Sequence, residues 1–200
     1  MSTDVATSRW SGGVSPYGIS WKKMMMWWFI VNDGLVFSGF LVSYGFVRLA
    51  SDAWPVRVEI FSMPFITLMT FVLITSSATM AAAVAAAHNG KAKDVRRFVL
   101  LTVAGGGTFL LMQAIEWGTL IHEGAQLGSN PWGVRAFSAY FFLITGLHGT
   151  HVLIGVITLV IVAIRASKGR YTAEGIELAG LYWHFVDLVW VFVFGCFYLI

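Results

Sequence analysis

Six ionisable side chains interrupt the apolar runs of this 200-residue sequence, and their types could support several kinds of chemistry. They are Asp33, Glu116, His148, His151, His184 and Asp187. An ionisable group inside an apolar run costs free energy unless a partner satisfies it, so each marks a functional or fold-specifying position. The histidines could bind a metal or a haem. Histidines and carboxylates in sequence could relay protons. Both residue types could also form hydrogen bonds that join neighbouring helices.

The pair His148 and His151 offers the clearest ligand pattern, because a spacing of three puts both rings on one face of a helix. His184 could act as a third ligand, or could complete a bis-histidine haem site with one of the pair. The sequence has no cysteine pair, no Glu-x-x-His and no carboxylate beside these histidines. We therefore predict no catalytic residue, metal site or bound cofactor in this chain, and expect the polar groups to join helices.

Other enzyme motifs are missing as well. The sequence contains no phosphate-binding glycine loop followed by lysine, no Gly-x-Ser-x-Gly, no His-Glu-x-x-His and no dinucleotide fingerprint. Cys196 is the single cysteine, so no internal disulfide can form. Any function is expected to lie in the apolar segments.

These apolar segments have the composition and length of membrane helices. The chain is 58% hydrophobic and 12% charged, whereas soluble chains are roughly a quarter charged. Five runs exceed the ~20 residues that a helix needs to cross a bilayer: 24–47, 60–87, 98–121, 136–164 and 178–200. None shows the alternation of barrel strands. The predicted fold is all-α, with a polar tail over 1–20 and one bundle of five transmembrane helices over 21–200.

Lysine and arginine are unequally shared between the two ends of these helices, which predicts the orientation. One end carries Arg9, Lys22, Lys23, Lys91, Lys93, Arg96, Arg97, Arg165, Lys168 and Arg170, and the other carries Arg48, Arg57 and Arg135. The positive-inside rule places the N-terminus inside and the C-terminus outside. The basic loops indicate contact with anionic lipid rather than nucleic acid, and Arg165 with Lys168 could bind a lipid phosphate.

Depth along the helices indicates which polar groups could meet. Asp33, His148, His151 and Asp187 lie near the middle of three helices, and His184 lies one turn further in. We therefore predict a hydrogen bond from Asp33 or Asp187 to His148 or His151. Glu116 lies ~10 Å outward from the middle of its own helix.

Small residues predict the tight contacts of the bundle. Gly146, Gly149 and Gly155 surround the two histidines, and small residues let helix backbones approach closely. The glycines at 105–107 indicate either a close crossing or a local irregularity, and the small residues at 78–87 indicate a packing face. Trp190 lies too deep for an interfacial aromatic belt and is expected to pack in the core.

Longer motifs resemble one protein family. Gly146-Leu-His-Gly-Thr-His-Val-Leu-Ile-Gly155, then Glu177, then Tyr182-Trp-His-Phe-Val-Asp-Leu-Val-Trp190 are similar in order and spacing to subunit III of haem–copper terminal oxidases. Gln113-Ala-Ile-Glu-Trp117 and Val31-Asn-Asp-Gly-Leu-Val-Phe-Ser-Gly39 resemble that family's carboxylate-bearing segments. The likeness covers about residues 22–200 and fits the short five-helix bacterial form. Longer members have two further helices that form one wall of a lipid-filled cleft.

The resemblance implies a non-catalytic, multi-pass subunit of the bacterial inner membrane. Such a subunit packs on the catalytic subunit I, binds structural phospholipid and supports proton uptake, while its partners hold haem and copper. Subunit II, a small fourth subunit and a respiratory supercomplex are the further partners implied. Asp33 would be the buried acid of the lipid cleft, where the family usually has Glu, and Arg165 would lie near lipid headgroups. Interhelical structure is implied for Glu116, His148, His151, Glu177, His184 and Asp187.

Several alternatives remain open from the sequence. Cytochrome c oxidase is the expected host complex, with a quinol oxidase or a nitric oxide reductase as the alternative. A free-standing transporter or channel is a different class, supported only by the polar groups at mid-depth and without an inverted repeat of broken helices. A haem-binding electron carrier is a third class.

Overall fold

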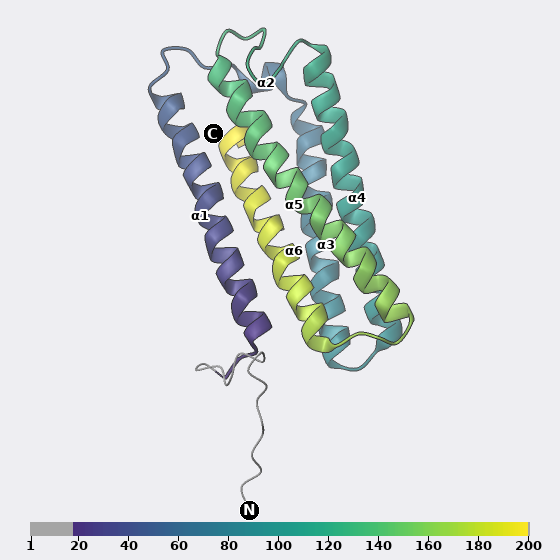
Figure 1. The fold of residues 1–200 in the computed structure, drawn as a ribbon. Helices are drawn as coiled ribbons and strands as arrows, with labels where there is room; N and C mark the ends of the chain where they lie inside the picture. Colours follow the sequence, from purple (N-terminus) through teal and green to yellow (C-terminus); the bar gives the residue numbers. More distant parts are fainter. Residues whose placement is uncertain (1–17, 200) are drawn as a thin grey trace, which may run out of the picture.

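The computed structural model describes residues 18–199, and these form five long helices with two short helical segments (Figure 1). The long helices are α1 (Trp21–Leu49), α3 (Met63–His88), α4 (Ala92–His122), α5 (Arg135–Ser167) and α6 (Ala173–Phe194). The short helix α2 (Arg57–Ile60) precedes α3, and the π-helical turn η1 (Gly195–Leu199) continues α6. Five helices are long and apolar enough to cross a membrane, which confirms the predicted fold class. The tail predicted over 1–20 falls mostly outside the described residues.

The helices extend beyond most of the apolar runs seen in the sequence. α4 begins at Ala92, before the run at 98, because Lys93, Asp94, Arg96 and Arg97 continue the helix at the membrane boundary. Long basic side chains can do this while keeping their charges in water. α3 is the exception: it begins at Met63 rather than 60, because Phe61 has an extended backbone and a proline occupies the first turn.

The five helices pack unevenly, and α1 is the outlying member. α3 lies between α4 and α6, and α5 packs on both α4 and α6 (Figure 1). α1 packs mainly against α6 and α5, and only Phe37 and Tyr44 of this helix are buried. Most of its apolar surface is therefore open to lipid or to another protein.

Two buried tryptophans join α6 to α3. Trp183 and Trp190 are 1% and 0% exposed, and each indole Nε1 donates a hydrogen bond to a hydroxyl on α3. The acceptors are Ser76 Oγ at 3.1 Å and Thr70 Oγ1 at 3.0 Å. A buried indole N–H needs such an acceptor. The expected packing role of Trp190 is confirmed.

The glycines of α4 allow α3 and the Trp183 ring of α6 to approach this helix closely. A Cβ added to Gly106 would lie 2.4 Å from Trp183 Cη2, and one added to Gly105 would lie 2.6 Å from Ser76 Cβ. α4 runs without a break through both residues. The glycine segment at 105–107 therefore marks a close crossing and not an irregularity.

The glycines beside the two histidines also pack closely. A Cβ on Gly149 of α5 would lie 2.9 Å from Gln113 Oε1, and one on Gly146 would lie 3.0 Å from Trp117 Cη2. The amide of Gln113 donates a hydrogen bond of 2.7 Å to the Thr145 carbonyl, so α4 and α5 also share a polar contact. The predicted close packing around the histidines is confirmed.

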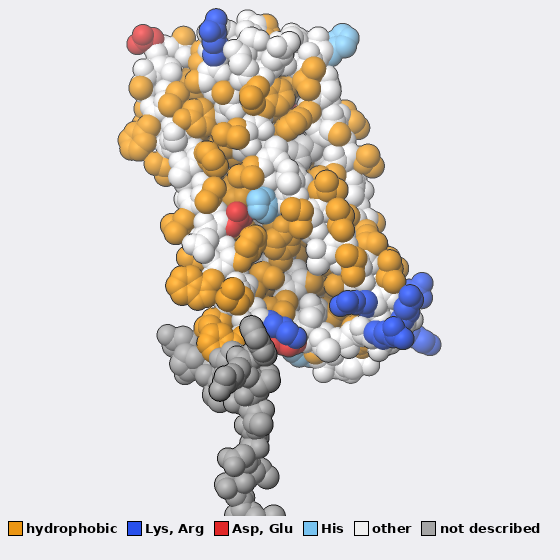
Figure 2. Space-filling model, in the orientation of Figure 1, with side chains coloured by type: hydrophobic (Ala, Val, Ile, Leu, Met, Phe, Trp, Pro, Cys, Tyr) orange, Lys and Arg blue, Asp and Glu red, His pale blue; other side chains and the backbone are white. Residues whose placement is uncertain are grey.

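Basic side chains gather at one end of the bundle, as Figure 2 shows, while hydrophobic side chains cover its middle. The start of α1 and the α3–α4 and α5–α6 turns meet at this end (Figure 1). It carries Lys22, Lys23, Lys91, Lys93, Arg96, Arg97, Arg165, Lys168 and Arg170. Arg9 lies outside the described residues. Which end faces the cytoplasm stays a prediction.

Candidate functional site

Asp33 of α1 and His151 of α5 face each other midway along the two helices. His151 Nε2 lies 3.3 Å from Asp33 Oδ2, and the two side chains are only 14% and 15% exposed. The atoms are within ion-pair distance but are not aligned as a hydrogen bond, so Asp33 Oδ2 has no hydrogen-bond partner among residues 18–199. Of the pairings predicted from depth, the structure brings this one together, but as a close contact and not as the predicted hydrogen bond.

The hydrogen bond made by His151 Nδ1 determines whether Nε2 can donate to Asp33 or accept from it. His151 Nδ1 lies 2.8 Å from the Leu147 carbonyl oxygen, which can only accept, so Nδ1 carries a proton. Nε2 therefore presents either a lone pair to a protonated Asp33 or a second proton to an ionised Asp33.

Aromatic and apolar side chains surround this pair. Phe37 meets the His151 ring edge-on at 5.5 Å, and the Tyr182 hydroxyl donates to the His151 carbonyl at 2.9 Å. An apolar groove of about 360 Å³ begins at Gly34, next to Asp33, and runs between α1 and α6 as far as Cys196. The carboxyl–imidazole pair thus lies beside a groove that is open to the membrane.

His148 lies in the core and away from the carboxylates. It is 0% exposed, and its ring lies 5.1 Å from Trp190 and 5.6 Å from Phe109. Neither ring nitrogen has a hydrogen-bond partner among the described residues, so the predicted pairing does not extend to His148. His148 and His151 enter different surroundings, and no cluster of three or more metal-ligating side chains occurs within residues 18–199.

His184 and Asp187 of α6 meet a hydroxyl of α3, and not the residues predicted as their partners. His184 Nδ1 lies 2.6 Å from Ser77 Oγ, and the Asp187 carboxyl also interacts with this hydroxyl. Ser77 can accept from His184 and donate to Asp187, because a hydroxyl does both. Equal depth did not reveal this contact, since depth does not tell which neighbouring helix a side chain faces.

Glu177 forms an ion pair with Lys23 at the basic end of the bundle. The Lys23 Nζ to Glu177 Oε1 distance is 2.5 Å, and the side chains are 31% and 28% exposed. Pairs this open contribute only about 0–1 kcal/mol. The contact therefore orients the start of α1 on α6 more than it stabilises the bundle.

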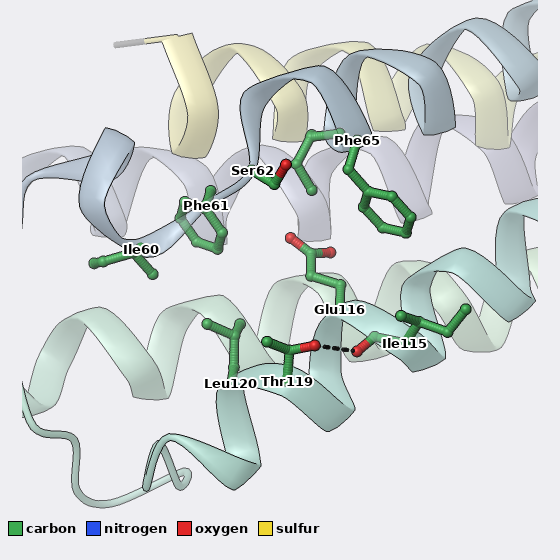
Figure 3. A pocket seen from close by; sticks show the side chains of 9 residues that line it. Ile60, Phe61, Ser62, Phe65, Ile115, Glu116, Thr119 and Leu120 are labelled. Carbon is green, nitrogen blue, oxygen red and sulfur yellow. Dashed lines mark hydrogen bonds between the residues drawn. The ribbon is translucent and has the colours of Figure 1, made fainter.

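Glu116 of α4 is 7% exposed and receives a hydrogen bond from Tyr198 of η1. The Tyr198 hydroxyl lies 2.8 Å from Glu116 Oε1, while Oε2 has no hydrogen-bond partner among residues 18–199. Figure 3 shows this side chain pointing from α4 towards the segment that carries Phe61, Ser62 and Phe65. The interhelical link expected of Glu116 is present, but only through one oxygen.

Arg165 is exposed on the last turn of α5, at the basic end. It lies fourteen residues beyond His151, or about 21 Å along the helix. Asp33 and Arg165 therefore belong to different depths and do not share one site.

Sequence reasoning missed the partners Ser77, Tyr198 and Lys23. Hydroxyls are common in apolar helices, so Ser77 carried no signal of its own. Lys23 and Glu177 both lie at the basic end of the bundle, and Tyr198 and Glu116 both lie towards the opposite end. Shared depth was the only available indication.

Comparison with known proteins gives consistent matches along the chain. A family model described as cytochrome c oxidase subunit III matches residues 10–200. The chain is 31% identical over 181 residues to cytochrome c oxidase subunit 3 of Bacillus sp. strain PS3, covering 89% of this chain and 85% of that protein. It is 33% identical to cytochrome c oxidase subunit 3 of Corynebacterium diphtheriae, covering 86% and 84%. It is 32% identical to quinol oxidase subunit 3 of Bacillus spizizenii, again covering 86% and 84%.

Proposed function

This chain belongs to the family of cytochrome c oxidase subunit III, and from that premise we propose that it packs on the catalytic subunit I of a bacterial terminal oxidase. In that position it binds structural phospholipid and supports proton uptake and the durability of the complex. Haem and copper belong to the partner subunits, and the complex lies in the bacterial cytoplasmic membrane.

The contact between Asp33 and His151, beside the groove between α1 and α6, carries this proposal. The groove is apolar and about 360 Å³ in volume, which suits a segment of acyl chain. Asp33 and His151 lie 3.3 Å apart beside it, and their side chains are only 15% and 14% exposed. An acyl chain in this groove would exclude water from the pair and fill the gap beside the outlying helix α1.

Arg165 supports a second lipid contact at the basic end of the bundle. It is exposed in the last turn of α5, and lysines and arginines of the two neighbouring turns lie at the same end. A guanidinium binds phosphate oxygens in a bidentate manner. Arg165 would therefore hold a phospholipid headgroup at the membrane surface.

The electron donor of the complex is proposed as cytochrome c, with quinol as the alternative. Two of the relatives above carry the name cytochrome c oxidase and one carries the name quinol oxidase, at similar identity. A nitric oxide reductase remains a further host to distinguish.

Affinity purification of the tagged chain in mild detergent tests the proposal. We expect a haem–copper subunit I and a subunit II to copurify, with a visible haem spectrum that follows the complex. Activity assays of the purified complex would then identify the host. Oxidation of reduced cytochrome c indicates a cytochrome c oxidase, oxidation of a quinol indicates a quinol oxidase, and reduction of nitric oxide indicates a nitric oxide reductase. Recovery of the intact, folded chain without any haem-containing partner would contradict the proposed role.

A further inference from the structure

The carboxyl group of Glu116 is buried with only half of its hydrogen-bonding capacity used. Oε1 accepts the single O–H of the buried Tyr198, so this phenol has no second hydrogen bond to donate to the other oxygen. Oε2 has no partner among the described residues. A buried acceptor without a donor costs free energy, so this oxygen indicates a hydrogen-bond donor supplied from outside the described chain.

A cavity of about 220 Å³ lies beside this carboxyl group and is open on one side. Phe61, Phe65 and Leu120 supply apolar walls around Glu116 (Figure 3). Ile66 also lines the cavity. Sites for whole drug-sized ligands are usually larger, about 300–1,000 Å³. The cavity therefore suits the head of an amphiphile, with the remaining apolar part lying outside against the helices.

The lining combines the acceptors Glu116 and Thr119 with the Ser62 hydroxyl, which can also donate, and so favours an uncharged head that bears a hydroxyl. Thr119 Oγ1 donates to the Ile115 carbonyl at 3.0 Å, so its oxygen is left to accept. Within residues 18–199, the cavity lining contains no lysine or arginine. A phosphate group would therefore lie beside a carboxyl group without a positive charge to balance it. One hydroxyl, in contrast, can be satisfied by Glu116 Oε2 alone.

The position along the membrane fits an amphiphile of this kind. Glu116 lies six residues before the end of α4, or about 9 Å below it. A shallow depression lined by His122 and Glu123 shares Ile115 and Thr119 with the cavity, so polar residues border its outer rim. Tyr198, which positions the carboxyl group, belongs to a π-helical turn, a feature that frequently occurs at functional sites.

We infer that the cavity beside Glu116 binds an uncharged, hydroxyl-bearing membrane amphiphile whose hydroxyl donates to Glu116 Oε2. A quinol and a neutral glycerolipid both have this chemistry. The site lies on α3 and α4 and does not depend on the lipid role proposed for the groove beside Asp33.

Protection of Glu116 from a hydrophobic carbodiimide tests this inference. The complete oxidase complex is placed in nanodiscs of phosphatidylcholine alone and treated with dicyclohexylcarbodiimide, which attaches to carboxyl groups in apolar surroundings. Peptide mass spectrometry then measures labelling at Glu116 and Asp33, without an added probe and with decylubiquinol or dioleoylglycerol. We expect at least one probe to lower Glu116 labelling several-fold, with Asp33 labelling unchanged. The probe that protects identifies the source of the hydroxyl.

A cavity-filling variant gives an independent control. Phe65→Trp should remove the protection while Glu116 remains, whereas Ile154→Trp, at an exposed position on α5, should retain it. Equal labelling with and without both probes would overturn the inference. Absence of Glu116 labelling in the probe-free complex, with labelling gained once partner subunits are removed, would also overturn it, because a protein surface would then cover the cavity.

Discussion

His151 Nε2 lies 3.3 Å from Asp33 Oδ2, and this contact joins the outlying helix α1 to α5. The His151 ring is held by the Leu147 carbonyl on its other side, so the imidazole cannot turn away without losing a hydrogen bond. α1 buries few of its own side chains. The carboxyl group of Asp33 is therefore a link that can be removed without disturbing the core of the other four helices.

We predict that Asp33→Ala leaves assembly of the complex intact and shortens its working life. The substitution removes the partner of His151 and a polar edge of the adjacent groove, so bound phospholipid should be lost and inactivation should come several-fold sooner. Oxygen consumption during prolonged turnover and phospholipid content per haem measure both effects. Asp52→Ala, in the exposed connection after α1, is the matched control. Unchanged lipid content together with unchanged inactivation kinetics would refute the prediction.

Removal of the hydroxyl shared by His184 and Asp187 should destabilise the bundle. Ser77→Ala leaves the half-buried imidazole nitrogen without its partner, which should cost about 0.5–1.5 kcal/mol. Asp187→Ala should lower the yield of assembled complex for the same reason. Thr75→Ala is the control, because this exposed hydroxyl bonds only to the Phe71 carbonyl of its own helix. Thermal unfolding in nanodiscs should separate Ser77→Ala from Thr75→Ala, and equal midpoints would disprove the assignment.

A methyl group added to α4 where the Trp183 side chain of α6 reaches it should be poorly tolerated. The Cβ of Gly106→Ala would lie 2.4 Å from the fully buried Trp183 ring. Overpacking of this kind typically costs about 1–3 kcal/mol. Gly107→Ala introduces the same methyl group one residue later, where nothing lies within 4 Å. The yield and thermal midpoint should fall for Gly106→Ala alone, and a similar loss in both variants would point to helix flexibility instead.

The predicted orientation can be checked with single cysteines in a Cys196→Ala background. Ser167 and Ser129 are exposed at opposite ends of the bundle. If the basic end faces the cytoplasm, a membrane-impermeant maleimide added to intact cells should label Ser129→Cys, and should label Ser167→Cys only after permeabilisation. The reverse pattern would show that the positive-inside assignment is wrong.

The sequence alone was sufficient to predict the five membrane helices, because this part of the fold depends on local properties. Runs of more than ~20 apolar residues can satisfy their backbone groups in a bilayer only as helices. The glycines at 105–107 predicted either a close crossing or a local irregularity, and the structure was needed to decide for the crossing. The first residues of the helices were less predictable. α3 begins at Met63, with Pro64 in its first turn, and α4 begins within a charged segment.

The tertiary structure decided which polar groups meet. Depth placed Asp33, His148 and His151 at one level, but only the rotation of α5 turns His151 towards α1 and His148 into the core. The partners Ser77 and Tyr198 became visible only when α3 and η1 were in place. The position of a residue within an apolar run indicates how far it lies along the membrane normal. The direction that a side chain faces depends on packing between helices, and this packing involves contacts between residues far apart in the sequence.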